Sequence, residues 1–252
     1  MEVSVIVIMG LGFFAGLLIG AAGIGGVILV PSLIYFAEVP IHSAITGASM
    51  SFILTGVIGT FLYARAGSIR WDMAAWLSAG AAPGALAGAH TSQVASGALL
   101  EIAIGLLTAL AGLHSLFLRR DREVCNAASM HPWTLAAVGA VTGFASALTG
   151  TGGPLVLIPL LMAIGRPVLA AVGLAQVIQL PVSLFATAGN FHSGILDPRI
   201  GGLLLLGVPL GSWAGSKIAH TLPGPALRRV VSILLVSTGA LMIGKIAARF
   251  VM

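Results

Sequence analysis

The chain has 252 residues, of which 58% are hydrophobic and 8% charged, and its formal net charge is +5. Soluble globular proteins carry about 25% charged residues, so this composition excludes an ordinary soluble protein and indicates one embedded in a lipid bilayer. The twelve Lys and Arg residues fall mostly between apolar segments, where they are typical topology determinants rather than a surface for nucleic acid. The single cysteine, Cys125, excludes an intramolecular disulfide and a cysteine metal cluster.

Long uncharged segments cover most of the chain. A membrane-spanning helix needs about 20 predominantly apolar residues, and most of these segments are long enough. They lack the short alternating pattern of β-barrel strands, so the sequence predicts an all-α polytopic membrane protein. Charged residues are absent from 3–37, 39–64, 73–100, 102–118, 124–165 and 167–196.

The sequence of residues 1–125 predicts a series of helices, the first of which is interrupted by a glycine cluster. An apolar run from residue 3 reaches the cluster Gly23-Ile24-Gly25-Gly26 and resumes as a short helix over 27–37. Each glycine costs a helix about 1 kcal/mol relative to Ala, so the cluster predicts a turn between two helical arms. Three full helices are predicted after this hairpin, over 43–64, 72–90 and 97–118.

Residues 126–252 show the same order of elements. The apolar run breaks at Gly150-Thr151-Gly152-Gly153 and resumes as a short helix over 154–165. Each half is therefore predicted to contain one glycine-broken helical hairpin and three full transmembrane helices. In the second half the full helices are predicted over 168–190, 199–217 and 226–246.

The two halves are related by a constant shift along the chain, the repeat offset, which places Gly12 on Gly139. At this offset, 11 of the 17 glycines in the first half coincide with glycines in the second half, whereas random placement gives about two or three coincidences. The chain is therefore predicted to be two copies of one unit, 1–125 and 126–252. The matched glycines of the first unit are Gly12, Gly16, Gly23, Gly25, Gly26, Gly67, Gly80, Gly84, Gly88, Gly97 and Gly112.

The distribution of basic residues predicts that the two repeats are inverted. Loop 91–97 has no Lys or Arg, whereas its counterpart, 217–229, is the most basic loop of the second half. If basic loops are cytoplasmic, equivalent loops lie on opposite faces of the membrane. Lys245 and Arg249 disagree with this assignment, because they place positive charge at an external C-terminus.

Inversion constrains the two broken segments, 3–37 and 132–165. Each must begin and end on the same face, and about 35 helical residues extend only about 50 Å. That length is short for two crossings and a turn, so each segment is predicted to be a hairpin with a longer and a shorter arm. The two turns enter from opposite faces and are expected to meet near the midplane of the membrane.

A repeated spacing of glycines predicts close helix packing. Gly80, Gly84 and Gly88 are spaced by four residues, and the same pattern recurs at 207–215. Small residues at this spacing let another helix approach closely in a membrane. Helix packing is therefore the favoured interpretation of both stripes, ahead of a role in ligand binding.

The glycine turns are the predicted substrate site. A helix that begins inside the membrane presents unpaired N–H groups and a partial positive charge at its N-terminus, which together favour an anion. The alternative is that the glycines only allow tight contacts between helices. The candidate residues of the two turns are Gly23, Gly25, Gly26, Thr149, Thr151, Gly152 and Gly153.

Polar residues on the helix after each hairpin extend the candidate site. Gln176 and Gln179 are spaced to lie on one face of a helix and are predicted to be a pair of amide donors, with interhelical hydrogen bonding as an equal alternative. Ser49 is added from the equivalent helix of the first half, where interhelical bonding is the favoured interpretation. Phe52, Phe185 and Trp213 lie in the middle of their segments and are able to line an apolar pocket, although ordinary packing is favoured.

The sequence shows no pattern for catalysis, a metal or a cofactor. The six histidines are scattered without a metal-binding spacing, and neither glycine cluster is followed by the Gly-Lys-Ser or Gly-Lys-Thr of a nucleotide-binding loop. An intramembrane enzyme would need a titratable cluster at membrane depth, and none is visible. Glu101, a few residues inside an apolar segment, is the best candidate for proton coupling.

The two glycine turns, followed by Pro31-Ser32-Leu33 and Pro159-Leu160-Leu161, resemble the paired signatures of the TauE/SafE sulfite-exporter family. The resemblance covers nearly the whole chain. It also includes the segment from Gly67-Ser68-Ile69-Arg70 to Pro83-Gly84 and its counterpart from Gly194 to Gly215. It implies a multi-pass permease of the cell inner membrane that carries small sulfur-containing anions.

In length and plan the chain is also similar to bacterial 4-toluenesulfonate uptake permeases. We therefore predict a secondary transporter that takes up an organic sulfonate, with an exporter of sulfite or another small sulfur oxyanion as the alternative. An intramembrane enzyme and a non-transporting membrane subunit are alternatives of other classes. The expected partners are the sulfonate or sulfur oxyanion, the lipid bilayer and a second copy of the chain in a homodimer, but no nucleic acid.

Overall fold

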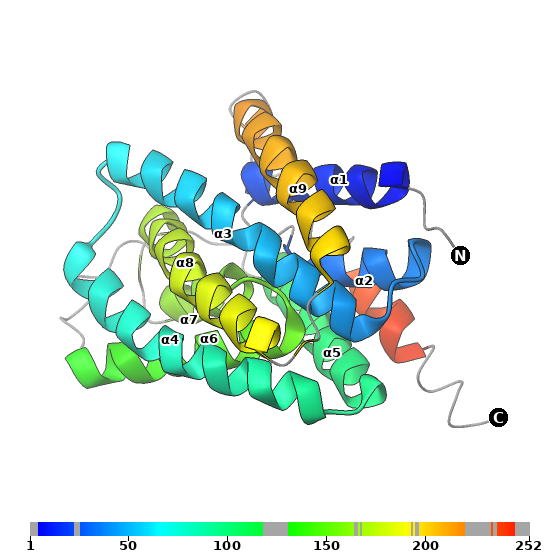
Figure 1. Cartoon of the computed structure of the whole chain (residues 1–252). Coiled ribbons are helices and arrows are strands. Elements are labelled where there is room, and N and C mark those ends of the chain that lie inside the picture. Colours follow the sequence, from blue (N-terminus) through cyan, green and yellow to red (C-terminus); the bar gives the residue numbers. More distant parts are fainter. Residues whose placement is uncertain are drawn as a thin grey trace.

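The described part of the chain is built from helices. The computed structural model describes residues 5–22, 26–117, 131–163, 166, 168–192, 194, 197–219, 233 and 236–244, and no strand occurs among them. The all-helical prediction is therefore confirmed for these residues (Figure 1). The helices are α1 Val5–Ala22, α2 Gly26–Phe36, α3 Ile41–Arg65, α4 Trp71–Val94, α5 Gly97–Phe117, α6 Pro132–Thr149, α7 Pro154–Ala163, α8 Val168–His192 and α9 Pro198–Ala219.

The helix boundaries agree with the sequence to within a few residues. Each broken segment has a longer arm, α1 or α6, of 18 residues and a shorter arm, α2 of 11 or α7 of 10 residues. The last predicted helix, 226–246, lies partly outside the described residues, and within it 233 and 236–244 are helical. The predicted division of the chain at 125/126 also lies outside them.

Three described helices are long and apolar enough to cross a membrane. They are Ile41–Arg65, Pro132–Thr149 and Ala170–His192. The second of these, α6, is the longer arm of a hairpin, and its 18 residues extend about 27 Å, which nearly matches the hydrocarbon core of a bilayer. Helix α4 has 24 residues and is long enough to cross a membrane. Many of its residues are Ala, Gly and Ser, which lower its mean hydropathy.

Glycine ends the corresponding helices of the two halves. Gly67 follows α3 and Gly194 follows α8, with left-handed φ angles of 63° and 68°. Only glycine adopts this conformation without a steric penalty. The two glycines are related by the repeat offset, so the same backbone device ends the same helix in each half.

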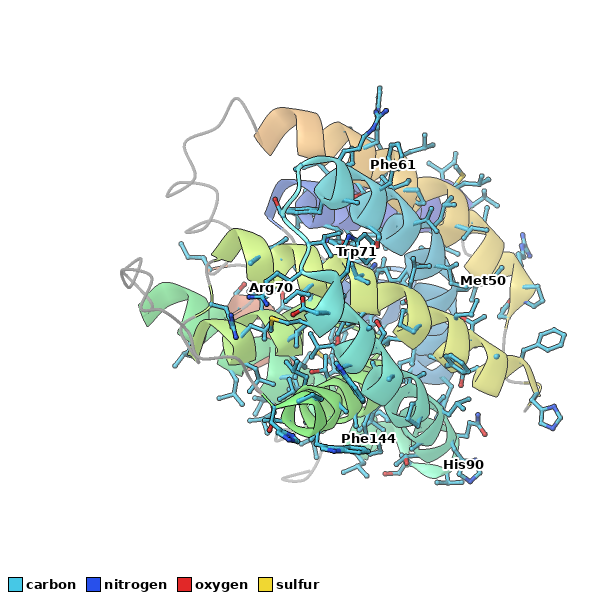
Figure 2. The ribbon with its side chains drawn as sticks, turned by 90° about the vertical axis from the view of Figure 1, so that its left-hand side faces the viewer. Met50, Phe61, Arg70, Trp71, His90 and Phe144 are labelled. Atoms are coloured by element: carbon cyan, nitrogen blue, oxygen red, sulfur yellow. The ribbon has the colours of Figure 1, made fainter. Side chains whose placement is uncertain are left out.

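The glycine stripes hold pairs of helices from different halves against each other. A Cβ atom on Gly84 of α4 would overlap the backbone carbonyl of Ala140 of α6, and one on Gly211 of α9 would overlap that of Phe13 of α1. Small residues therefore allow backbone-to-backbone contact. Figure 2 shows Arg70 and Trp71 at one end of α4, His90 toward the other, and Phe144 of α6 beside it.

These contacts exchange between the halves at the repeat offset. The offset takes Gly84 forward to Gly211, and it takes Ala140 back to Phe13. The contact of Gly80 with Ala136 likewise corresponds to that of Gly207 with Met9, and the contact of Gly88 with Phe144 to that of Gly215 with Leu17. Such reciprocal contacts are the pattern that a two-fold relation between two copies produces.

The halves interlock in the hydrophobic interior. One buried cluster combines α1, α2, α3 and α5 with Ile200, Leu204 and Val208 of α9. The other combines α6, α7 and α8 with α4, from Met73 to Ala89. Each cluster thus includes a helix from the opposite half, so the two sequence repeats are not packed as separate domains.

Large apolar side chains also cover much of the surface. Soluble monomers rarely expose extensive apolar surface, whereas lipid solvates it. The described surface is therefore suited to a bilayer. The most exposed of these side chains are Ile6, Phe36, Val94, Trp133 and Phe191.

Candidate functional site

The two glycine turns meet in the structure. A Cβ atom on Gly26, the first residue of α2, would lie 2.7 Å from the backbone oxygen of Thr151, in the turn between α6 and α7. Turns that the repeat offset relates in the sequence are thus in direct contact, as the hairpin interpretation predicts. Gly23 and Gly25 of the first turn lie outside the described residues.

The second turn depends on glycine for two separate reasons. Gly150, Gly152 and Gly153 have φ angles of 68°, 80° and 102°, which L-residues with a side chain rarely adopt. A Cβ atom on Gly152 would also lie 2.7 Å from Cδ2 of Phe52. The turn therefore holds an unusual backbone conformation directly against an aromatic ring of α3.

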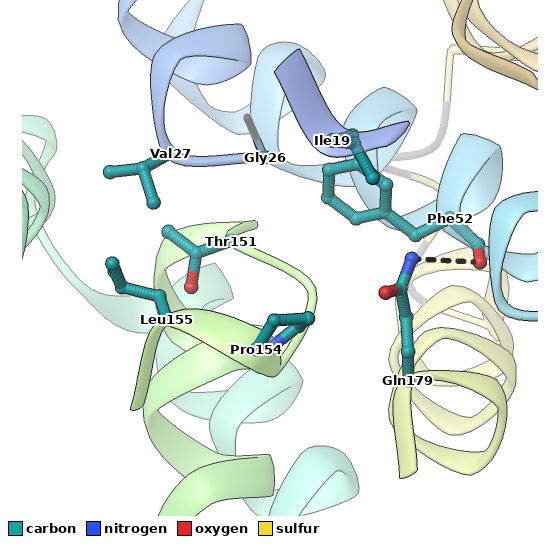
Figure 3. Close-up of a pocket in the computed structure, with 8 residues that line it drawn as sticks. All are labelled: Ile19, Gly26, Val27, Phe52, Thr151, Pro154, Leu155 and Gln179. Atoms are coloured by element: carbon teal, nitrogen blue, oxygen red, sulfur yellow. Dashed lines mark hydrogen bonds between the residues drawn. The ribbon is translucent and has the colours of Figure 1, made fainter. Parts of the chain in front are cut away.

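A small pocket lies where the turns meet α3 and α8 (Figure 3). It has about 230 Å³ of unfilled space, including its open mouth, and its interior holds about one water molecule. Most of its lining side chains are apolar, and the polar ones are a threonine hydroxyl and a glutamine amide. The lining residues are Ile19, Gly26, Val27, Phe52, Thr151, Pro154, Leu155 and Gln179.

The pocket combines two helix starts without a charged side chain. Helix α2 begins at Gly26 and α7 begins at Pro154, and both residues line the pocket. The first N–H groups of a helix have no partner within it, and its N-terminus carries about half a positive charge. In α7, however, Pro154 has no N–H, and the N–H groups of Val156 and Leu157 donate to the backbone oxygen of Gly153 at 3.2 Å. Because none of the lining residues is charged, the helix ends are the main positive feature of the pocket.

Gln179 is anchored by α3. Its Nε2 atom donates to Oγ1 of Thr55 at 2.7 Å and lies 3.3 Å from the backbone oxygen of Phe52, while the hydroxyl of Thr55 donates to the same oxygen at 3.1 Å. These bonds direct the amide nitrogen to α3, and Figure 3 shows Oε1 on the side of Pro154. In this conformation Gln179 thus presents an acceptor to the pocket, whereas the sequence predicts a donor.

Thr149 and Thr151 form a pair of hydroxyls beside the pocket. Their Oγ1 atoms are 3.0 Å apart, and Thr149 donates to the backbone oxygen of Ala145 at 2.7 Å. Since a hydroxyl has one proton, Thr151 is the donor in the bond between the two. Thr151 lines the pocket, and Thr149 is fully buried behind it.

Gln176 and Ser49 lie outside the lining of the pocket. The side-chain oxygen of Gln176 lies against Gly59 of α3, and its backbone oxygen accepts from Thr60 at 3.2 Å. Ser49 donates to the backbone oxygen of Ile45 at 2.9 Å. Of the predicted residues, the structure thus brings Gly26, Thr151 and Gln179 together at the pocket, with Gly152 and Gly153 adjacent.

The apolar lining of the pocket is largely invisible at the level of sequence. From the sequence, Phe52 is able to line a pocket, but ordinary packing is the favoured interpretation. The repeat offset is the signal that identifies it, because this offset places Phe52 on Gln179 and both line the pocket. The other apolar residues, such as Ile19 and Leu155, carry no signal that distinguishes them from core residues.

The described residues contain no group of three His, Cys, Asp or Glu side chains that could hold a metal ion. The chemistry available at the pocket is therefore hydrogen bonding, helix dipoles and apolar contact. These properties allow reversible binding of a small molecule, and the residues that line the pocket include no nucleophile paired with a base. The arrangement defines a helical membrane protein with a small, mostly apolar pocket that residues of both halves line.

The chain belongs to the sulfite exporter TauE/SafE family, whose profile matches residues 8–242. The resemblance carried by the two glycine turns is thereby confirmed, and the family is one of membrane transporters. The probable membrane transporter protein YdhB of Bacillus subtilis is 25% identical over 244 residues, covering 95% of this chain and 98% of that protein.

A second relative is a probable membrane transporter protein of Xylella fastidiosa strain 9a5c. It is 28% identical over 225 residues, covering 86% of this chain and 85% of that protein. The probable membrane transporter protein YunE of Bacillus subtilis is 25% identical over 242 residues, covering 85% of this chain and 87% of that protein. No solved structure matches the chain significantly.

Proposed function

We propose that the protein is a secondary transporter that takes up organic sulfonate anions across the cell inner membrane. The observation that carries the proposal is the pocket between two helix N-termini, whose remaining walls are mostly apolar. An organic sulfonate has a charged oxyanion at one end and an apolar group at the other. The two parts of the pocket correspond to these two parts of the substrate.

The charged end of the substrate would bind at the starts of α2 and α7. Helix N-termini stabilise an anion without a charged side chain. The anion would therefore bind with moderate affinity and be able to dissociate. Thr151 would add a hydroxyl donor by turning its proton from Thr149 to the ligand. The lack of side chains at Gly26, Gly152 and Gly153 would let an oxyanion approach the backbone.

The apolar end would contact Phe52 and its neighbours. The ring is 1% exposed in this structure, and once uncovered it would offer a flat surface on which an aryl or alkyl group is able to pack. Because the interior holds about one water molecule, binding would require α2 or α7 to move away from α3. We expect such a movement to be part of transport.

The same proposal implies how the two repeats are oriented relative to each other in the membrane. In many transporters, broken helices of two inverted repeats form the substrate site, and one repeat moves against the other. The reciprocal contacts of α1 with α9 and of α4 with α6 support a two-fold relation, and the basic loops support inversion. We propose that the axis lies in the plane of the membrane.

Export of sulfite is the second candidate function. Two observations favour it, namely the name of the family and the small volume of the pocket interior, which suits a compact oxyanion. Sulfite needs only the helix ends and the hydroxyl of Thr151. The contact with Phe52 would then contribute packing and no specificity.

A binding and transport assay distinguishes these functions. Purified protein would be screened by thermal unfolding with toluenesulfonate, isethionate, taurine, sulfite and sulfate, because a ligand at about 100 times its Kd stabilises the native state by about 2.7 kcal/mol. Uptake of the best ligand would then be measured in liposomes. Stabilisation by toluenesulfonate with uptake supports the proposal, stabilisation by sulfite alone supports the exporter, and absence of transport for every anion contradicts both.

A further inference from the structure

A row of polar side chains follows one face of α8 and is not explained by packing. Its members recur every three or four residues, the spacing of one helix face. We refer to this set as the α8 polar row. It consists of Gln176, Gln179, Ser183, Thr187 and Asn190.

Four atoms of the α8 polar row have no hydrogen-bond partner among the described residues. They are Oε1 of Gln176, Oγ of Ser183, Oγ1 of Thr187 and Nδ2 of Asn190. The residues Gln176, Ser183 and Asn190 are only 5%, 1% and 0% exposed. A buried polar group without a partner costs about 1–3 kcal/mol, so four of them on one helix require an explanation.

The hydroxyls of α3 are bonded differently from those of α8, and outside α8 the described residues include one more buried hydroxyl without a partner, that of Ser146 of α6. Ser49, Ser51 and Thr55 each donate to a backbone oxygen three or four residues earlier in α3, at 2.9, 2.8 and 3.1 Å. Local bonds of this kind are the usual way to satisfy a hydroxyl in a membrane helix. Ser183 and Thr187 make no such bond, and their hydroxyls have no partner among the described residues.

The α8 polar row is continuous with the pocket. Gln179, its second member, lines the pocket, Gln176 lies one turn before it, and the remaining members continue from it toward the end of α8. From Gln176 to Asn190 the row extends about 21 Å along the helix, which is most of the thickness of a bilayer core. At its far end, Oδ1 of Asn190 lies 3.5 Å from Nε2 of Gln93 of α4.

We propose that the α8 polar row is the aqueous path by which a sulfur oxyanion passes between the pocket and the membrane surface. This inference rests on the proposed transport function. In the conformation of this structure the polar atoms are buried between α8 and its neighbours. When the helices separate, water and the anion replace the missing partners, with Ser183, Thr187 and Asn190 supplying neutral donors to the oxyanion.

Neutral donors suit a path better than fixed charges would. An arginine or lysine at membrane depth would bind an anion strongly and delay its release. Hydroxyl and amide groups replace water around the ion at several successive positions, each with a modest net contribution. The row thus offers several weak positions along α8, in addition to the pocket at Gln179.

The test measures access of water to cysteines placed in the row. In a Cys125→Ser background, Ser183→Cys and Thr187→Cys would be treated with a membrane-impermeant methanethiosulfonate reagent that carries a sulfonate. Matched controls are Ser51→Cys in α3 and Thr108→Cys in α5, because both residues are 0% exposed and bond to their own helix. The hydrated thiolate attacks the reagent, forms a mixed disulfide and displaces methanesulfinate, so the rate of the reaction reports the access of water to the cysteine.

We expect both α8 cysteines to react about tenfold faster or more than the controls, and toluenesulfonate or sulfite to slow that reaction. Equal rates at Ser183→Cys and Ser51→Cys, with normal uptake, would overturn the path while leaving transport intact. If the α8 cysteines react fast but the Cys125→Ser parent protein takes up neither anion, the proposed function is contradicted and the water path is still supported. The two proposals therefore fail separately.

Discussion

Gln179 and Phe52 occupy the same position in the two halves of the chain, and they contact each other. Their separation in the sequence equals the repeat offset, and Nε2 of Gln179 lies 3.3 Å from the backbone oxygen of Phe52. Two equivalent residues are able to touch only close to the axis that relates the copies. The pocket lies where these two residues meet, and one half of the chain contributes an apolar ring while the other contributes a polar amide.

The bond between Gln179 and Thr55 gives the first prediction. Thr55→Val removes the 2.7 Å acceptor of Nε2 and leaves a buried donor with one longer partner, so we expect a loss of about 1–2 kcal/mol in the free energy of unfolding. Gln179→Leu in the same protein should reduce that loss, because it removes the unpaired donor. Denaturation of the single and double variants in detergent would measure the coupling.

Additive effects in that double-mutant cycle would contradict the bond. Thr108→Val is a suitable comparison, because Thr108 is equally buried and its hydroxyl donates to the backbone oxygen of Ile104 in its own helix. Its removal should cost less, since no second side chain depends on it.

The glycine stripes give the second prediction. Gly84→Ala and Gly211→Ala would each place a Cβ atom on a backbone carbonyl of the facing helix, so the helices must separate, at a cost of about 1–3 kcal/mol. Because the two sites are equivalent by the repeat, the losses should be similar. Thermal unfolding and the yield of folded protein would be measured. We expect the protein that still folds to keep its ligand affinity.

Two other glycines provide the controls for this prediction. A Cβ atom added to Gly202 of α9 or to Gly10 of α1 would have no neighbouring atom within 4 Å. Ala at either site should leave stability unchanged or raise it slightly, because Ala favours helix over Gly. Equal damage at Gly202 and Gly211 would show that glycine content matters in these helices and close packing does not.

The repeat makes much of the fold predictable from the sequence. Glycine positions and uncharged segments identify the helices and both hairpins, because a broken helix and a close helix contact each require glycine for a physical reason. The pairing of α1 with α9 is not predictable in this way. It depends on which stripe faces which helix, and the helices of this chain are apolar enough to face several partners.

The candidate site is only partly predictable for a related reason. Thr151 and Gln179 stand out as polar residues in apolar segments, and both line the pocket. Gln176 stands out equally, yet its side chain lies against Gly59. Spacing on a helix selects a face, but which part of that face reaches the pocket depends on the packing of α8 against α3.

The third prediction concerns the orientation of the repeats. Gly97 begins α5, and its equivalent is Gly224, which lies outside the described residues. With inverted repeats, Gly97→Cys and Gly224→Cys in a Cys125→Ser background should react with an impermeant thiol reagent from opposite faces of the membrane. Right-side-out and inside-out vesicles would be compared. Reaction of both cysteines from one face would show parallel repeats and contradict hairpins that enter from opposite sides.

The fourth prediction concerns the turn at the pocket. Gly152→Ala would place a Cβ atom 2.7 Å from the ring of Phe52 at a φ of 80°, so we expect affinity for toluenesulfonate to fall by more than about tenfold. Gly194→Ala is the matched control, because Gly194 has a φ of 68° and nothing within 4 Å of the added Cβ. It should cost about 1 kcal/mol of stability and leave affinity unchanged.

Phe52→Ala separates the two ends of the proposed substrate. In the double variant Gly152→Ala/Phe52→Ala, loss of the ring relieves its clash with the new Cβ atom at position 152. The same loss removes the apolar surface for an aryl group. The double variant should therefore recover sulfite binding and remain weak toward toluenesulfonate. Calorimetric titration of both anions would decide. Recovery of both affinities to the same degree would mean that Phe52 makes no contact with the substrate, and the sulfonate specificity proposed for the pocket would then be wrong.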